Sequence, residues 1–292
     1  MDASCRLGVA IAAFNSADVI RGCLQPLRGL DADVVLFDDG SSDGTAEIAR
    51  QVRPDIVILH GDGNQWWTGG TNAAIEECLK RGADYVLLLN PDVRIDRRGV
   101  EQLVEYAQGT VLTVVAAMVV DDRDTDRIAW AGSRFGRVVP GLPVYASRFV
   151  AKSGTLVSDL PETPYEVDDA HGRGVLVPRT VIEAIGLPDA TRFPHYGADI
   201  DYFFRARKAG AKIVVYPGVR ARLLVDHTGL RAPDSRTVKG RVVNIWNYLF
   251  ARKHGDAVRM WWRLYWAHLK PHQAVASYAF VLAVNVFRKM TR

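Results

Sequence analysis

Apolar runs and segments with helical spacing alternate through the first hundred residues. Between the runs, apolar spacing predicts a helix after Asn15, a helix to about Val52 that Thr45 caps, and a helix over 69–82 that Gly82 ends. Continuous apolar strands that alternate with helices are typical of an α/β fold, in which helices cover both faces of a parallel sheet. The runs that read as buried strands lie at 7–14, 33–37, 55–60 and 84–89.

The pattern is less regular from 111 to 170. A strand is predicted at 113–120, and the Pro- and Gly-rich segments between Gly132 and Pro164 could form a lobe that meets a second substrate. We find no internal repeat. Regular elements return as a strand at 172–178, helices at 181–185 and 199–209, and a strand at 212–217.

Charge divides the chain of 292 residues into a body and a tail. Residues 239–292 hold ten Lys and Arg against the single acid Asp256, which leaves 27 of the 37 basic and 32 of the 33 acidic residues in the body. The tail also holds four of the seven tryptophans. We therefore expect a main domain over 1–238, with halves at 1–110 and 111–238, and a basic, Trp-rich helical tail over 239–292.

The cysteines and the N-terminus point to a reducing compartment. Cys5, Cys23 and Cys78 fit neither a disulfide framework nor a zinc ligand pattern, so we expect them to be reduced and structural. The first residues lack the long apolar block and the cleavage site of a secretory signal. A cytoplasmic protein is expected.

Polar residues and glycines follow the predicted strands. In open α/β sheets, ligands bind beyond the carboxyl ends of the strands. Acids, amides and glycines there suit a nucleotide, its diphosphate and a cation. No GxGxxG follows the first strand and no GxxxxGK[ST] occurs, so dinucleotide and P-loop sites lose their main support. The residues in question are Asn15, Asp38, Asp39, the loop 61–70, and Asn90-Pro91-Asp92.

Four motifs together resemble glycosyltransferase family 2, with the GT-A fold of rhamnosyltransferase-like bacterial enzymes. The resemblance covers roughly residues 7–255 and does not specify the sugar. It implies a mostly parallel central sheet flanked by helices, with a helical C-terminal extension. It also implies inverting, metal-dependent transfer from a nucleotide-diphosphate sugar to a glycan or lipid-linked acceptor. The motifs are "FNSADVIRGCL", "FDDGSSDGT", "WWTGGTNAAIEECLKRGADYVLLLNPDVRI" and "FPHYGADIDYFFRARKAG".

Asn90-Pro91-Asp92 resembles the family's DXD element, with Asn90 in the first acidic position. The leaving diphosphate needs a cation, and Mn²⁺ or Mg²⁺ prefers hard oxygen ligands. We therefore assign the metal to Asp92 and contacts with ribose or sugar hydroxyls to Asn90. The resemblance adds His227, a late histidine near the diphosphate, as a second candidate ligand. The alternative is a plain turn, since all three residue types favour turns.

Other family positions imply the donor site. Asp38 and Asp39 stand where an acid accepts hydrogen bonds from base and ribose, which favours UDP or dTDP, whereas Asp43 is expected only to cap a helix. Phe14 keeps a stacking surface for the base. Gly69 and Gly70, read as the start of a helix, let backbone approach an anion. The remaining donor candidates are Asn15, Asn72 and Trp67, of which Trp67 could equally pack in the core.

Asp199 maps onto the family's catalytic base, the Asp of a Glu-Asp pair. Ala198 replaces the Glu, and Asp201 either substitutes in part or pairs with Arg205 four residues later. The alternative for Asp199 is a helix N-cap. Weaker candidates for contacts with acceptor or phosphate are His171, Arg173 and His195.

The tail suggests a membrane interface. In 257–270, Val258, Trp261, Trp262, Tyr265 and Leu269 share one helical face and Arg259, Arg263 and Lys270 another, a pattern suited to anionic lipids. The apolar run at 274–287 is too short to span a bilayer. We expect peripheral attachment to the inner face of the cell membrane and a role in polysaccharide or cell-wall biosynthesis. Alternatively, the helix packs on the body or on a second subunit of a homo-oligomer. Nucleic acid is not expected.

Two other functions remain open. A nucleotidyltransferase would share the nucleotide site but needs a basic, Gly-rich first loop that "AAFNSADVI" lacks. A catalytically degenerate, membrane-associated scaffold is suggested by Asn90 and Ala198, where the family has acids.

Overall fold

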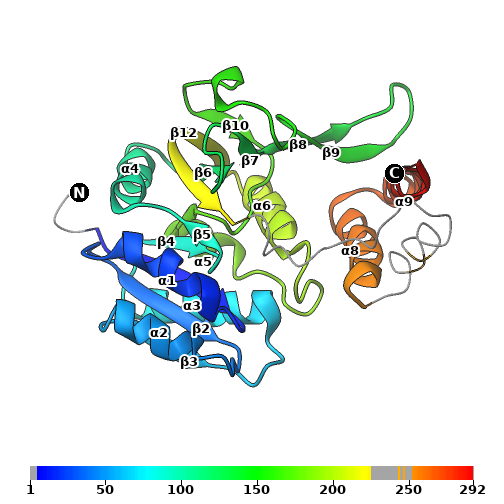
Figure 1. Ribbon diagram of the computed structural model, residues 1–292. Coiled ribbons are helices and arrows are strands. Elements are labelled where there is room, and N and C mark those ends of the chain that lie inside the picture. The colour runs from blue at the N-terminus through cyan, green and yellow to red at the C-terminus, as the bar shows by residue number, and fades with distance from the viewer. Residues whose placement is uncertain (1–4, 225–242, 244–245, 247–251, 292) are drawn as a thin grey trace. The chain divides into compact units, whose positions relative to one another are not determined.

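The computed structural model describes residues 5–224, 243, 246 and 252–291, which belong to two compact units (Figure 1). Unit 1 comprises Met1–Ser133 and Phe149–His227, and unit 2 comprises Arg134–Arg148 and Thr228–Arg292. The second unit therefore combines a segment from the middle of the chain with the C-terminal helices.

Unit 1 is built on a mixed sheet whose neighbours run β3-β2-β1-β4-β11-β6-β12-β10. The strands β3, β2, β1 and β4 are parallel, as the sequence predicts, while β11 runs antiparallel between β4 and β6. Their bounds are β1 (Leu7–Ala13), β2 (Asp33–Asp38), β3 (Val57–His60), β4 (Tyr85–Leu89), β6 (Thr113–Asp121), β10 (Tyr165–Val167), β11 (Val175–Pro178) and β12 (Lys212–Leu223). Two short strands join the path: β5 (Val93–Arg94) pairs with β12 and β7 (Ile128–Trp130) with β6.

Strand order reverses direction at β1. From β1 the chain proceeds outward to β2 and β3 on one side, and β4 then pairs on the other side of β1. A crevice forms at the carboxyl ends of strands at such a switch point. The ends of β1, β2 and β4 are therefore the place to look for a ligand site.

Helices cover the sheet and connect its strands. Helix α3 packs on β1 and β2, α1 packs on α2, and α4 packs on β6 and β12. The helices of unit 1 are α1 (Ala17–Leu24), α2 (Thr45–Val52), α3 (Trp66–Lys80), α4 (Arg97–Gln108), α5 (Arg179–Ile185) and α6 (Ala198–Lys208), with 3-10 turns η1 (Gln25–Leu27) and η2 (Val157–Asp159).

The start of α2 differs from the prediction that Thr45 caps it. Gly44 occupies the N-cap position with a positive φ of 87°, and Thr45 is the first helical residue. Asp43 does act as a cap, because its carboxylate accepts from Thr45 N and Oγ1 and also from Ala17 N at the start of α1. One carboxylate thus joins the first turns of two helices.

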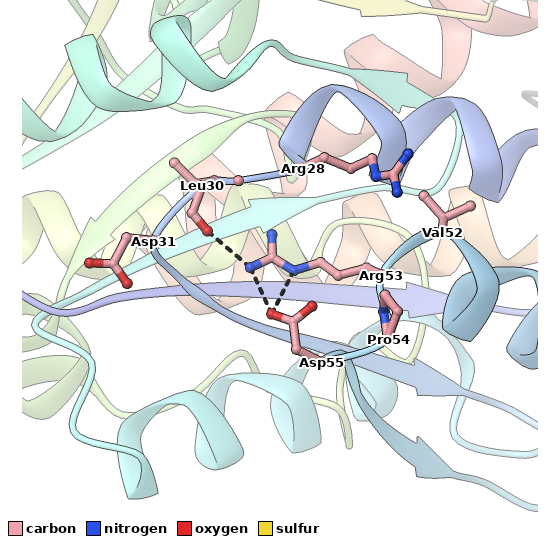
Figure 2. A pocket seen from close by; sticks show the side chains of 8 residues that line it. Arg28, Leu30, Asp31, Val52, Arg53, Pro54 and Asp55 are labelled. Carbon is pink, nitrogen blue, oxygen red and sulfur yellow. Dashed lines mark hydrogen bonds and ion pairs between the residues drawn. The ribbon is translucent and has the colours of Figure 1, made fainter.

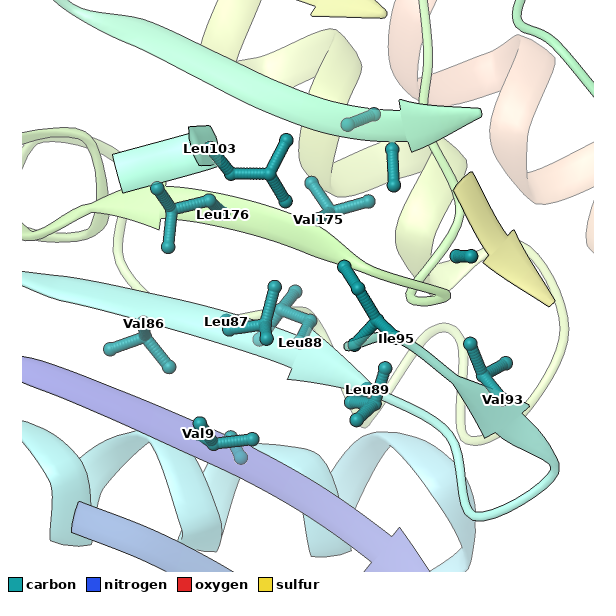
Figure 3. Packing of buried hydrophobic residues seen from close by; sticks show 14 of the residues in the cluster. Val9, Val86, Leu87, Leu88, Leu89, Val93, Ile95, Leu103, Val175 and Leu176 are labelled. Atoms are coloured by element: carbon teal, nitrogen blue, oxygen red, sulfur yellow. The ribbon is translucent and has the colours of Figure 1, made fainter. Parts of the chain in front are cut away.

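The core lies between the sheet and its helices. Leu87, Leu88 and Leu89 of β4 are buried, and Figure 3 shows them among Val9, Val175 and other aliphatic side chains of neighbouring strands. Because β4 is central, both of its faces are covered, which explains its continuous apolar run. The cysteines are free, as expected, and Cys23 and Cys78 are buried.

A hollow opens at the amino ends of β2 and β3, on the edge of the sheet opposite to the strand ends considered above. Figure 2 shows Arg53 in it, whose guanidinium donates to the carbonyls of Leu27, Leu30 and Ala32 and pairs with Asp55. Because the guanidinium of Arg53 binds these carbonyls, it holds the segment that leads into β2. We therefore interpret the hollow as a structural feature.

Unit 2 packs a β-hairpin on two helices. The hairpin, β8 (Ser133–Arg137) and β9 (Tyr145–Phe149), was not foreseen in the irregular segment of the sequence. Within unit 2, Tyr145 N donates to Ser277 Oγ at 2.8 Å, and the ring of Phe135 stacks on Tyr265. The helices are α8 (Arg252–His268) and α9 (Pro271–Thr291). In the part of the chain that the structure describes, no helix has both the length and the apolarity needed to cross a bilayer.

The exposed face of α8 differs from the expected apolar face. Tyr265 is only 1% exposed and packs inside unit 2. Instead, Trp262 and Trp266 are exposed, and their rings stack at 5.1 Å. They alternate with exposed cations at helical spacing, so that aromatic and basic groups share one face. This face, called here the Trp/Arg face, consists of Arg259, Trp262, Arg263, Trp266 and Lys270.

Candidate functional site

The loops after β1 and β2 are joined through Asn15. Its backbone lies in the left-handed region, with φ 47°, which Asn tolerates better than most residues. The side-chain Oδ1 accepts from Ser42 N, and the backbone N–H donates to Ser41 Oγ. Asn15 thus holds the two loops together and leaves the neighbouring Phe14 58% exposed.

The two acids after β2 have different surroundings. The carboxylate of Asp39 accepts hydrogen bonds from the N–H groups of Gly63, Gln65 and Trp66, and so organises the loop that leads into α3. Among the described residues, the Asp38 carboxylate accepts one hydrogen bond, from Ser41 N through Oδ1, although the residue is buried. A base or ribose contact therefore suits Asp38 better than Asp39.

The start of α3 lies against the segment before α6. Trp66 adopts φ 56°, an uncommon conformation for a bulky residue and one that concentrates at functional sites. Its ring lies 5.9 Å from that of His195. Thr68 donates through Oγ1 to Phe193 O at 2.6 Å and through N to Pro194 O. The loop with His195 is thereby attached to the donor half of unit 1.

The expectation that Gly69 and Gly70 begin a helix is wrong. Helix α3 begins at Trp66, and Gly69 N already donates to Gln65 O within it. A Cβ at Gly70 would lie 2.8 Å from the Phe37 ring and 3.2 Å from Ala12 Cβ. Gly70 therefore allows α3 to approach the sheet closely, and its N–H is not at the helix end.

Trp67 connects α3 with the end of β4. Its Nε1 donates to Asn90 Oδ1 at 2.8 Å, and Gly172 packs so closely on the ring that a Cβ there would overlap it. Asn90 O accepts from Val93 N, so Asn90-Pro91-Asp92 does form a turn. The turn geometry and a ligand role are compatible, because the turn fixes Asp92 at the strand end.

Asp92 is the described residue that the sequence predicts to bind a cation. It lies near the Cys23 thiol, whose pKa is raised chiefly by burial and further by the Asp92 charge. The described ranges contain no group of three or more His, Cys, Asp or Glu side chains that could hold a metal, and His227 lies outside them. One carboxylate fits Mg²⁺ or Mn²⁺ that arrives with a diphosphate, because such ions keep waters and take their other ligands from phosphates.

Asp199 lies in the first turn of α6, and the alternative that it is an N-cap is wrong. Gly197, with φ 83°, is the N-cap residue, and Asp199 follows it by two positions. Its Oδ1 accepts from Ile200 N. Asp201 does pair with Arg205, at 2.9 Å, and Arg205 also donates to Ile185 O and Leu187 O. Asp201 is therefore a structural anchor of α6.

Two further candidates are held by the backbone around them. Asn72 Nδ2 donates to Pro188 O at 2.8 Å, which ties α3 to the segment after α5. His171 accepts through its backbone O from Arg173 N and stacks its ring on Trp130, with centroids 4.9 Å apart. Trp130 thus holds the His171 ring in position, whereas the Asn72 side chain connects two segments of the fold.

The structure adds Asp169, which sequence reasoning missed. It is 2% exposed and accepts from Ser133 Oγ at 2.6 Å. The pKa of Asp169 is raised by burial above all, and the charges of Asp199 and Asp168 raise it further, while His171 and the Ser133 hydrogen bond lower it. The adjacent acids in "VDDAHGRG" were the available signal, but their segment shows no regular pattern.

Comparisons with known proteins show the family and the fold of this chain. The family model described as Glycosyl transferase family 2 matches residues 8–180. The low-salt glycan biosynthesis hexosyltransferase Agl10 of Haloferax volcanii is 25% identical over 217 residues, which are 71% of this chain and 63% of that protein. Undecaprenyl-phosphate mannosyltransferase of Micrococcus luteus is 25% identical over 225 residues, 73% of this chain and 82% of that protein. This chain therefore spans less than two thirds of the Haloferax relative.

Solved structures share the fold. The crystal structure of GalNAc-T7 with UDP, GalNAc and Mn²⁺ superposes with a TM-score of 0.61 at 14% identity and covers 97% of this chain and 55% of that one. At this identity the likeness shows the GT-A fold alone. The family model, in contrast, matches more than half of the sequence and includes the ends of β1, β2 and β4. The chain belongs to glycosyl transferase family 2.

Proposed function

We propose that this chain transfers a sugar, with inversion, from a nucleotide-diphosphate sugar to a glycan or lipid-linked acceptor. The observation that carries the proposal is that helix α3 contacts both the end of β4 and the loop before α6. Trp67 contacts Asn90, and Thr68 contacts the loop before Asp199. A donor site and a base are thereby attached to one helix. The names of the hexosyltransferase and mannosyltransferase relatives support the reaction class.

The donor base is assigned to the loops after β1 and β2. The exposed Phe14 ring offers a stacking surface, and the Asp38 carboxylate can accept from the N3–H of uracil or thymine. UDP or dTDP sugars are therefore the favoured donors. Asp39 contributes indirectly, because it holds the loop before α3.

Asp92 would hold Mn²⁺ or Mg²⁺ together with the donor diphosphate. When bound, the cation neutralises negative charge that grows on the leaving diphosphate. Asn90, whose Oδ1 already accepts from Trp67, has its amide donors left to contact ribose or sugar hydroxyls. The GalNAc-T7 structure with UDP and Mn²⁺ supports the choice of metal.

Asp199 takes the proton of the acceptor hydroxyl. An inverting transfer needs one base, which must lie on the acceptor side of the sugar. The position of Asp199 in the first turn of α6, directly after the loop that Thr68 attaches to α3, supports its assignment as this base.

The test is a screen of UDP, dTDP and GDP sugars by thermal shift with and without Mn²⁺, followed by assays of donor hydrolysis and transfer. We expect Asp199→Asn to abolish transfer while donor binding stays intact, and Asp92→Asn to weaken metal-dependent donor binding. Transfer by Asp199→Asn would refute its role as base. Absence of turnover together with absence of metal-dependent nucleotide binding would favour a degenerate scaffold instead.

A second part of the proposal is that the Trp/Arg face attaches the chain to anionic lipid. Tryptophan rings suit the headgroup level, and each Lys or Arg adds about 1 kcal/mol at an anionic surface. Helix α9, Pro271–Thr291, contains no acid that would oppose this attraction. The mannosyltransferase relative, named for undecaprenyl phosphate, supports a lipid-linked acceptor.

Vesicle sedimentation tests the attachment. Wild type is expected to bind vesicles that contain phosphatidylglycerol better than vesicles of phosphatidylcholine alone. Arg259→Glu and Trp266→Ser should each weaken binding several-fold, whereas Arg50→Glu, an equal charge change on exposed α2, should not. Equal binding by all variants would exclude the face as the contact.

A further inference from the structure

The two adjacent tryptophans at the start of α3 have different surroundings. Trp67 donates to Asn90 Oδ1 at 2.8 Å, and Gly172 packs closely on its ring, so this side chain is used inside the fold. Trp66 is 40% exposed, although its ring is large and mostly apolar. Successive side chains on a helix point about 100° apart, so the two rings cannot serve the same purpose. Trp66 is the tryptophan of this pair that a ligand can reach.

The backbone of Trp66 is held from the end of β2. The Asp39 carboxylate accepts from Trp66 N at 2.9 Å and from Gln65 N at 3.1 Å. Trp66 adopts φ 56°, a costly conformation for a bulky residue, which persists only where the surrounding structure determines it. The exposed ring therefore extends from a well-fixed point of the fold.

His195 places a second ring beside Trp66. The two ring centroids lie 5.9 Å apart, and the ring planes are inclined by 59°. Thr68, in the first turn of α3, donates through Oγ1 and through N to the carbonyls of the two residues before His195. The Trp66 and His195 rings, called here the aromatic wall, are therefore held together by the contacts that attach this loop to α3.

The aromatic wall connects the two sides of the proposed reaction. Trp66 precedes Trp67, which binds Asn90 at the strand end to which the diphosphate is assigned. His195 precedes Asp199, the assigned base, by four residues. Inversion requires the leaving group and the attacking oxygen to lie on opposite faces of the reacting carbon, so the transferred sugar lies between the diphosphate and the base. A wall that extends from one side to the other follows the position of this sugar.

We propose that Trp66 and His195 form a binding surface for the transferred sugar, against which its ring stacks, and that they contribute to binding of the sugar and not of the nucleotide. This inference rests on the proposed function. A sugar ring presents C–H groups on its faces, and aromatic side chains suit such an apolar surface. Stacking removes the exposed indole surface from water only when the donor carries its sugar.

The test compares the affinity for a nucleotide sugar with that for its free nucleoside diphosphate. Both are titrated calorimetrically with Mn²⁺ and without acceptor, and the probe is the UDP, dTDP or GDP sugar that binds wild type best. Trp66→Ala should weaken binding of the nucleotide sugar about 5- to 30-fold, the range expected for loss of a large aromatic contact. Its affinity for the nucleoside diphosphate should stay within about twofold, because Phe14, Asp38 and Asp92 are unchanged.

Three further variants and one spectroscopic signal make the test decisive. Trp66→Phe keeps an aromatic ring and should restore most of the affinity, and His195→Ala should weaken sugar binding by a smaller factor. Phe280→Ala removes a similarly exposed aromatic ring from α9 and should change neither affinity. In fluorine NMR of protein labelled with fluorotryptophan, the Trp66 signal is identified by its absence from Trp66→Phe. This signal should shift more with the nucleotide sugar than with the nucleoside diphosphate.

An equal loss of affinity for both ligands in Trp66→Ala would overturn the inference, because the ring would then act on the nucleotide or on its loop. Unchanged affinity for both would overturn it as well. If Trp66→Ala does not fold, unchanged affinities in His195→Ala together with an unshifted Trp66 signal overturn it instead. The proposed function fails separately, if wild type binds no nucleotide sugar or if Asp199→Asn retains transfer. A wild type and a Trp66→Ala variant that bind a nucleotide sugar equally well would reject only the role of the aromatic wall.

Discussion

Two adjacent glycines in α3 should respond to the same substitution in opposite ways. At Gly70, a new Cβ meets the buried Phe37 ring at 2.8 Å and Ala12 Cβ at 3.2 Å. At Gly69, it meets the side chain of Gln65, with Oε1 at 3.0 Å and Cβ at 3.2 Å. Gln65 is exposed and can move away, whereas Phe37 and Ala12 belong to the sheet.

The magnitude follows from two terms. Replacing Gly by Ala inside a helix stabilises it by about 1 kcal/mol, and this gain is the same at both positions. Forcing one extra methyl into a packed core costs about 1–3 kcal/mol. We therefore expect Gly69→Ala to stabilise unit 1 by up to ~1 kcal/mol and Gly70→Ala to change its stability by ~0 to −2 kcal/mol. The difference between the two variants isolates the packing term.

Equilibrium urea unfolding, followed by far-UV circular dichroism, measures both free energies. Isothermal titration with UDP in the presence of Mn²⁺ gives donor affinity alongside. Gly69→Ala should bind as wild type does, because Gly69 N donates to Gln65 O and is not available to a phosphate. A Gly69→Ala variant that loses UDP binding, or a Gly70→Ala variant at least as stable as Gly69→Ala, would refute the packing explanation.

Three other predictions follow from single contacts and pKa shifts. Trp67→Phe should destabilise unit 1 by about 1 kcal/mol, because Asn90 Oδ1 loses its hydrogen-bond donor. The variant should also bind the nucleotide sugar more weakly. Thermal unfolding and titration with UDP check both effects, and unchanged values would contradict the prediction. Burial raises the pKa of the Cys23 thiol and raises that of Cys78 to about 12, and both thiols are buried, whereas Cys5, whose pKa is also raised, is only partly buried. At pH 8 a disulfide reagent should therefore modify only Cys5 in the folded protein, as mass spectrometry would show; rapid labelling of Cys23 would contradict this. Because the pKa of Asp169 is raised on folding, its ionisation opposes folding as pH rises above the ordinary pKa of 3.8. The stability of Asp169→Asn relative to wild type should therefore increase between pH 4 and 7. A difference in melting temperature that stays constant over this range would argue against the prediction.

The strand ends could be located from sequence because their signal is local. The apolar runs that end at Asp38 and at Asn90 stop abruptly, and both become buried strands of the parallel half of the sheet. The order of strands beyond β4 was not accessible, because the antiparallel insertion of β11 depends on pairings between residues far apart in the chain. The local sequence pattern determines which segments form strands, whereas pairing between distant residues determines the order of the strands in the sheet.

Two errors at the site have identifiable causes. A Gly-Gly pair signals either approach to a ligand or approach to a sheet, and only the Phe37 contact distinguishes the two at Gly70. Asp169 escaped notice because its hydrogen-bond partner in the fold, Ser133, is 36 positions away in the sequence. The role of Asp199 as base, in contrast, is a prediction from the motif around it, and it remains a prediction.

The inserted hairpin has a practical consequence for truncated forms of this protein. The charge boundary near residue 238 invites truncation of the basic tail, yet the hairpin residues Phe135 and Tyr145 pack on Tyr265, Gln273 and Ser277, which that cut removes. A truncated chain would keep the hairpin and expose its aromatic side chains to water. Such a fragment should aggregate unless residues 134–148 are replaced by a short polar linker between Ser133 and Phe149. Unit 2 is compact but consists of two segments that are separate in the sequence, so both segments have to be removed to obtain unit 1 alone.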